Sequence, residues 1–225
     1  MKKYLFTFIS IIIVLIVIGK SRNVKELKIK EKVQIKESYK DLKKKGKLKK
    51  NTEHLDTLRK VYSNYFYNIG FDAPDSWTID KGMNKNTIFR TYQKDSAITF
   101  IIIVAEPKYT EKKEPNAWEV REGLGGKEYD KLFIENLEKQ SRNKISNFKV
   151  KKSYLKNNVC VKMTFETLIK ELDFEYKNVD ILYQTIVENK SFSFGLSVPK
   201  MYYELNESYY ENLFRNIYFL NNGSL

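Results

Sequence analysis

Apolar and polar residues alternate with a period of two through much of the chain, which predicts β-strands. The segment TIFRTYQ (87–93) alternates as a half-buried strand, whereas AITFIIIVAEP (97–107) is apolar on both faces, as a central strand covered on two sides would be. Two further pairs of strands, in residues 148–169 and 179–199, meet at Asn157-Asn158 and at Asn189-Lys190, where tight turns fit. We therefore expect two consecutive hairpins.

Helical spacing of apolar residues predicts two helices. Residues 128–140 carry the stripe Tyr129, Leu132, Phe133 and Leu137. In residues 206–220, Asn206 can cap a helix with the stripe Tyr210, Leu213, Phe214 and Ile217. The segment NAWEVREG around Trp118 is polar and is expected to be a loop. Because a two-faced central strand needs cover on both sides, the pattern predicts an α+β fold: an antiparallel β-sheet with helices on both faces, an α/β/α sandwich.

The stretch YSNYFYNIGFDAPDSW, residues 62–77, is rich in aromatic residues. Its elements Tyr-Ser-Asn, Gly-Phe and Pro-x-x-Trp resemble the opening of the PsbP-like domain, and the resemblance extends over about residues 61–220. That fold is shared by the photosystem extrinsic protein PsbP, a Ran-binding nuclear import factor and many exported bacterial proteins of unknown function. The resemblance implies a sandwich fold tied to no one chemistry. It also implies that Phe71 and Trp77 are core residues, Trp77 against a helix, and not the rim of an aromatic site.

The N-terminus has the pattern of a signal peptide or membrane anchor over residues 1–19. Lys2 and Lys3 precede an unbroken apolar run of 15 residues, 4–18, shorter than the roughly 20 that span a bilayer as a helix. Small residues for cleavage come only from Gly19 and Ser21, which favours an uncleaved anchor. Lysines after the run favour a cytoplasmic domain, whereas the basic leader favours export. We expect a domain outside the cytoplasmic membrane, or secreted if the leader is cleaved.

The net charge of +13 is concentrated in a Lys-rich stalk or linker, residues 20–51, which precedes a globular domain over 52–225. From residue 61 onward 23 basic residues face 22 acidic ones, so the domain is nearly neutral. The stalk could bind anionic lipid or a cell-wall polymer, or could be a solvated spacer. No nucleic-acid partner is expected, because no aromatic residues interleave the lysines, and the sequence identifies no protein partner. The candidate contacts are Lys43, Lys44, Lys45, Lys47, Lys49 and Lys50.

Few residues suit catalysis or metal binding. His54 and Cys160 are the only residues of their kinds, which argues against a Cys-His or Ser-His-Asp site and against zinc. Cys160 is expected to be a buried thiol on the strand face opposite Val161. The segment GLGGK (123–127) lacks the spacing of a phosphate loop and is expected to be a flexible loop. We therefore expect no catalytic, cofactor or metal site and no cofactor.

Three carboxylates, Glu171, Asp173 and Glu175, alternate along one strand, where they could hold calcium or simply face solvent on an edge strand. The favoured hypothesis is a non-enzymatic binding or accessory protein at the cell envelope. The alternatives are a cytoplasm-facing, chaperone-like protein that binds hydrophobic helices of secreted proteins, and an enzyme that uses these carboxylates or a metal.

Overall fold

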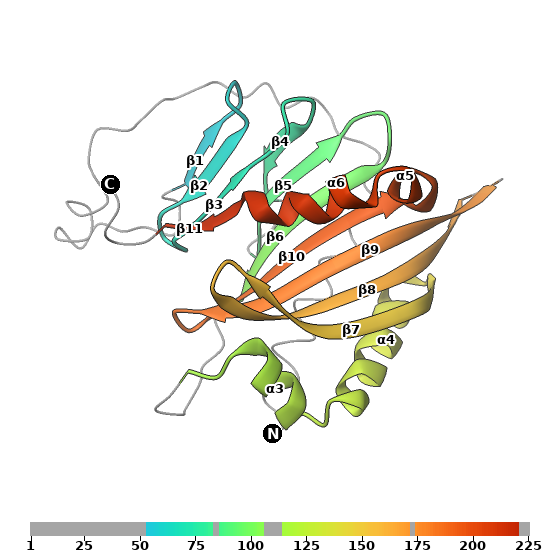
Figure 1. The fold of residues 1–225 in the computed structure, drawn as a ribbon. Coiled ribbons are helices and arrows are strands. Elements are labelled where there is room, and N and C mark those ends of the chain that lie inside the picture. Colours follow the sequence, from blue (N-terminus) through green and yellow to red (C-terminus); the bar gives the residue numbers. More distant parts are fainter. Residues whose placement is uncertain (1–52, 83–85, 106–113, 172–173, 221–225) are drawn as a thin grey trace.

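The chain forms two antiparallel sheets in a computed structural model that describes residues 53–82, 86–105, 114–171 and 174–220. The large sheet has seven strands in the order β4-β5-β6-β10-β9-β8-β7 (Figure 1). They are β4 (Thr78–Lys81), β5 (Thr87–Gln93), β6 (Ile98–Ala105), β7 (Lys144–Leu155), β8 (Asn158–Glu171), β9 (Phe174–Val187) and β10 (Lys190–Pro199). The small sheet has the order β1-β2-β3-β11, formed by β1 (Glu53–Asp56), β2 (Val61–Asn64), β3 (Ile69–Asp72) and β11 (Ile217–Phe219).

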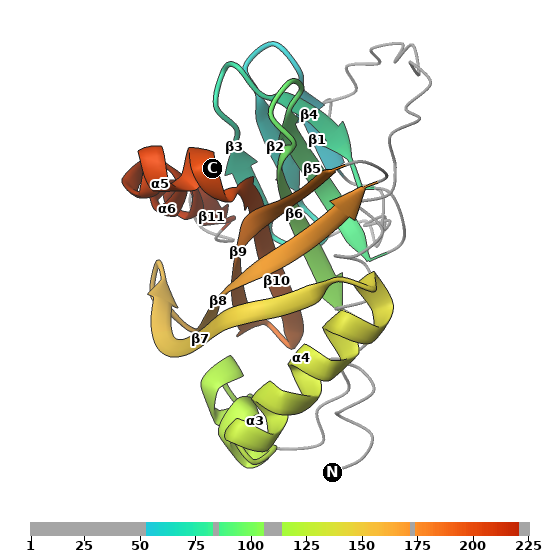
Figure 2. The ribbon, with the colours of Figure 1, turned by 90° about the vertical axis from the view of Figure 1, so that its right-hand side faces the viewer.

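Both faces of the large sheet are covered, as the apolar central strand β6 requires. Helices α3 (Ala117–Gly123) and α4 (Lys127–Ser141) pack on one face around Phe133, Met163 and Leu182. The other face carries the small sheet together with α5 (Lys200–Leu205), α6 (Glu207–Asn212) and the 3-10 helix η2 (Leu213–Asn216). Figure 2 shows α5 and α6 on the side of the sheet opposite α4. The expected antiparallel α+β fold with helices on both faces is therefore present, but the expectation of a single sheet is wrong, because the small sheet shares the second face with α5 and α6.

The predicted hairpins are confirmed: β7 pairs with β8 and β9 pairs with β10. Both turns lie one residue earlier than expected, at Lys156-Asn157 and at Glu188-Asn189, where Lys156, Glu188 and Asn189 have positive φ. Strands β8 and β9 pair as well, so the two hairpins form one continuous meander. Successive side chains alternate between the two cores, and β8 shows this clearly, since Val161 and Met163 belong to the core under α3 and α4 whereas Cys160 belongs to the opposite one.

The aromatic stretch 62–77 is a core segment, as expected. It forms the β2–β3 hairpin and not a single strand. Two asparagines stabilise the turn: Asn68 has a positive φ, and the Asn64 side chain accepts hydrogen bonds from backbone N–H groups within the turn. Phe71 stacks on Phe100 of the large sheet, with ring centroids 4.4 Å apart. Trp77 is 1 % exposed, and its indole bonds to Tyr209 of α6, so it packs against a helix.

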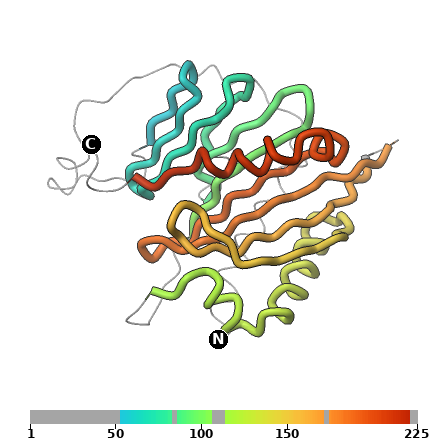
Figure 3. The backbone as a smooth tube through the Cα atoms, in the orientation of Figure 1, coloured from blue at the N-terminus to red at the C-terminus, as the bar shows by residue number. Residues whose placement is uncertain are grey.

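Two segments differ from the expectation. In the segment 206–220 the α-helix ends at Asn212, with Asn206 as its N-cap, and the 3-10 helix η2 follows. The chain then continues into β11, which pairs with β3 (Figure 3). Pairing at the open edge of β3 overrides the helical spacing there, although the predicted stripe is buried throughout. The polar segment around Trp118 is helix α3, which begins with a capping box of Asn116 and Glu119.

Candidate functional site

The six candidate lysines of the stalk, Lys43 to Lys50, lie outside the described residues, as do the leader and the stalk themselves. Their binding role stays a prediction. Of the described helices, none has the length and apolar character that a membrane span requires. Any other candidate binding surface has to be formed by residues of the folded domain.

The single histidine and the single cysteine of the chain lie in different sheets. His54 lies in β1, at the edge of the small sheet, opposite Ser63. Cys160 lies in β8 of the large sheet, fully buried, and burial raises the pKa of its thiol to about 12. The thiol is therefore protonated at neutral pH and behaves as a small apolar side chain, as expected.

The predicted carboxylate row is only partly described. Glu171 ends β8 and Asp173 lies outside the described residues, whereas Glu175 forms an ion pair of 3.1 Å with Lys170 across the strands. The expectation of one edge strand is wrong, because Glu171 belongs to β8 and Glu175 to β9, and both strands lie inside the sheet, whose edge is β7. Within the described ranges no cluster of three or more His, Cys, Asp or Glu side chains is placed to hold a metal ion.

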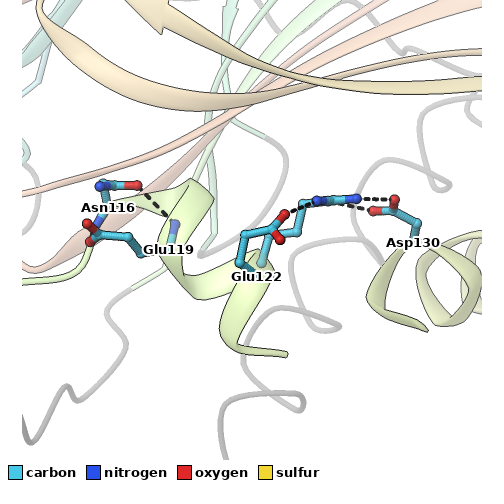
Figure 4. A network of polar contacts seen from close by, with 5 residues as sticks. Asn116, Glu119, Glu122 and Asp130 are labelled. Carbon is cyan, nitrogen blue, oxygen red and sulfur yellow. Dashed lines mark hydrogen bonds and ion pairs between the residues drawn. The ribbon is translucent and has the colours of Figure 1, made fainter. Parts of the chain in front are cut away.

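The GLGGK segment connects α3 to α4 in a tight turn: Gly123 ends α3 and Lys127 begins α4, so only residues 124–126 form the expected loop. Gly125 and Gly126 both have positive φ, which other residues adopt at a cost. Arg121 spans the turn: its Nε donates to Asp130 Oδ1 at 2.9 Å, and its other nitrogens contact Asp130 and Glu122 (Figure 4). Both carboxylates raise the pKa of Arg121, Asp130 most strongly. This network fixes the angle between the two helices.

Two charged anchors hold the C-terminal helices on the sheet. Lys200 at the start of α5 and Lys177 of β9 both contact Glu166 of β8, at 2.8 and 3.3 Å. Hydrogen bonds from Lys200 first, and also from Asn147, hold the pKa of Glu166 at about 2. The second anchor, between Lys162 and Glu211, is more deeply buried.

Lys162 of β8 donates to both carboxylate oxygens of Glu211 in α6, at 2.6 and 2.5 Å. Its side chain is 8 % exposed, and its ammonium also lies 5.4 Å from the ring centroid of Tyr183. Tyr203 of α5 donates to Glu211 as well. A buried lysine is stable only when paired, so this contact determines where α6 sits.

The anchored helices expose apolar side chains to solvent. Tyr203 and Tyr210 point into the core, whereas their neighbours point outward, Leu205 being 80 % exposed and Met201 64 %. We call this set the α5–α6 apolar surface; it consists of Met201, Tyr202, Leu205 and Tyr209. Apolar surface gathered in this way marks interaction sites more often than scattered single residues do.

A second surface follows the edge strand of the large sheet. We call it the β7 basic edge; it consists of Lys144, Lys149, Lys151 and Lys152, all exposed. Among the described residues none of the four has an ion-pair partner, whereas every lysine of β8, β9 and β10 has one. The near-neutral charge of the whole domain conceals this basic strand in the sequence. The signal was present: residues 139–165 contain eight Lys and Arg and no Asp or Glu.

Comparison with known proteins supports the fold. No protein-family model matches the chain, and no curated protein sequence matches it. Among solved structures, the cyanobacterial PsbP protein CyanoP from Synechocystis sp. PCC 6803 is similar with a TM-score of 0.55 and 13% identity, over 71% of this chain and 91% of that one. A protein from Bacteroides thetaiotaomicron matches with a TM-score of 0.43 and 13% identity, over 78% of this chain and 51% of that one. The domain therefore has a PsbP-like fold, and the resemblance noted from residues 62–77 is confirmed.

Proposed function

We propose that this chain is a non-enzymatic accessory protein of the cell envelope, tethered by its N-terminal segment, whose PsbP-like domain binds a protein partner. The observation that carries the proposal is the α5–α6 apolar surface. Leu205 and Met201 are each more than half exposed on helices that are otherwise well anchored, so their exposure does not arise from loose packing. Burying such side chains against a partner contributes roughly 25 cal/mol per Å² of apolar area.

The chemistry of this surface suits an apolar segment of another protein. Tyr202 and Tyr209 combine a large ring with a hydroxyl group, and Met201 is flexible enough to adapt to partners of different shape. Tyrosine and methionine are enriched at protein interfaces for these reasons. No step of bond making or breaking is assigned to the surface.

Site-specific photocrosslinking in living cells tests the proposal. A photoreactive residue at position 205 should give a discrete adduct with one protein, and Met201→Ser should reduce its yield at least fivefold. The control is position 58, where Leu58 is 86 % exposed on the turn between β1 and β2, far along the chain from the apolar surface. No adduct at position 205, or the same adducts at both positions, would contradict the proposal.

The same surface also favours the second candidate function, a cytoplasm-facing chaperone for hydrophobic helices of secreted proteins. The two functions differ in topology. A reporter fused after residue 225 that is active only outside the cytoplasmic membrane supports the envelope protein. Activity only in the cytoplasm supports the chaperone, in agreement with the lysines that follow the apolar run.

A further inference from the structure

We propose that the β7 basic edge docks the folded domain onto an anionic lipid bilayer. Four lysines lie on one strand of 12 residues, about 40 Å long, and no acidic residue lies among them. Because neighbouring side chains alternate, Lys149 and Lys151 project on the α6 side of the sheet and Lys152 on the α4 side. Long lysine side chains from both faces can thus reach one plane that touches the edge.

The pairing of β7 with β8 places like charges side by side. Lys151 lies directly opposite Lys162 in the register, an arrangement that destabilises a sheet. Lys162 is satisfied by Glu211, whereas Lys151 has no such partner among the described residues. A positive charge at position 151 therefore does not stabilise the fold. A negatively charged partner outside the domain accounts for a lysine at this position.

The edge is built against pairing with another strand, which excludes a second copy added to the sheet. A β-bulge interrupts the register between Ser146 and Lys149, and Asn147 within it has a φ of 55°. Asn147 also bonds through its side chain to Glu166, which fixes the bulge. Bulges and lysines both hinder strand addition at a sheet edge. The feature of β7 that a partner can still recognise is its positive charge.

The position of the domain in the chain favours a bilayer over a soluble polyanion. This step rests on the tether proposed above. The 32 residues of the stalk, 20–51, can separate the apolar run from the domain by at most about 110 Å. The bilayer is therefore present at high local concentration, and a modest affinity is enough for docking. Each lysine near an anionic surface contributes about a fivefold factor in binding.

The full chain, reconstituted through its apolar segment in nanodiscs, tests the inference. A fluorophore on Tyr154→Cys, at the exposed end of β7, reports contact through quenching by spin-labelled lipid. Cys160 stays unlabelled because it is buried. Quenching should be several-fold stronger in discs with 30% phosphatidylglycerol than in pure phosphatidylcholine, and 1 M salt should abolish the difference. A label on Leu58→Cys should show no such difference.

Charge reversal at the edge gives the decisive comparison. The triple variant Lys149→Glu, Lys151→Glu, Lys152→Glu should weaken docking at least 100-fold. Replacement of the same three residues by Arg should preserve it. A control triple with equal change in net charge, Lys60→Glu, Lys94→Glu, Lys127→Glu, should have little effect.

Three results would overturn the inference: equal quenching in both lipids, equal losses in both Glu triples, or binding to added polyphosphate without any approach to the bilayer. Failure of the tether gives a different result, because the chain then does not co-purify with discs of either composition. In that case the same discs are added to the free chain, and the edge is tested by the same quenching.

Discussion

Replacement of Trp77 by alanine should be among the most destabilising single changes in the domain. The side chain is 1 % exposed and belongs to the core that joins the small sheet, the large sheet and α6. A tryptophan of this kind buries roughly 200 Å² of apolar surface, worth about 5 kcal/mol at 25 cal/mol per Å². Partial collapse of the cavity brings the expected cost to about 3–5 kcal/mol.

A smaller contribution comes from the indole N–H, which bonds to Tyr209. Tyr209 is 37 % exposed, so its hydroxyl can turn to water when this bond is lost, and the loss should cost about 1 kcal/mol or less. Trp77→Phe separates the two effects because it keeps most of the apolar volume and removes the donor. It should cost about half as much as Trp77→Ala.

Urea unfolding followed by circular dichroism measures both variants. The midpoint of Trp77→Ala should fall strongly while the m-value stays unchanged. Trp118 is the control: it is half-buried in α3, with the Arg121 guanidinium 4.8 Å from its ring centroid, and Trp118→Ala should cost only about 1–2 kcal/mol. A midpoint of Trp77→Ala equal to that of the parent would refute the core assignment and return residues 62–77 to the possible binding sites.

Four further predictions follow from the anchors and the small sheet. The pKa of Glu166 lies at about 2, below its ordinary 4.5. The ionised Glu166 carboxylate therefore stabilises the fold above about pH 4.5, and this contribution disappears as the pH falls toward 2. The difference in unfolding free energy between the parent and Glu166→Gln, measured by urea unfolding, should shrink over that range. Lys162→Ala should cost about 3 kcal/mol because it leaves the Glu211 carboxylate without its cation, and Lys162→Met with Glu211→Leu should recover most of this loss in the same assay. Gly70→Ala should loosen β11, because a Cβ there would overlap the Tyr218 ring, and hydrogen exchange of residues 217–219 should rise; unchanged exchange would contradict the close approach. The chain without residues 1–50 should unfold in one cooperative transition, as calorimetry would show, if the stalk contributes nothing to the core.

Local pattern was sufficient to predict the long elements, whereas the short elements β1, β4 and α5 were not predicted. The strands of the meander and helix α4 were predictable because period-two and helical spacing reflect burial on one face of a single segment. The same alternation correctly placed Cys160 and Val161 in opposite cores. It failed for α3, whose capping box at Asn116 and Glu119 is a sequence signal that the polar composition concealed.

Long-range pairing decided what the pattern could not. Strand β11 exists because Ile217 meets Phe71, nearly 150 residues earlier in the chain, and no local spacing contains that contact. The separation of the strands into a large and a small sheet likewise depends on long-range pairing. Residue type likewise does not separate the buried Tyr210 from the exposed Tyr209 beside it, since only the docking of α6 on the sheet determines which ring faces solvent.

For the candidate surfaces, too, some properties follow from the sequence and others only from the tertiary structure. Composition alone shows that residues 139–165 are basic and without acidic residues. Whether each lysine is neutralised depends on its neighbours in space: Lys170 lies opposite Glu175 and pairs with it, whereas Lys151 lies opposite Lys162. The sequence therefore determined how much charge the segment carries. Only strand order and register decided that the charge on β7 lies at an open edge, without ion-pair partners in the part of the chain that the structure describes. The reason is that ion pairs form between residues that the fold, and not the chain order, brings together.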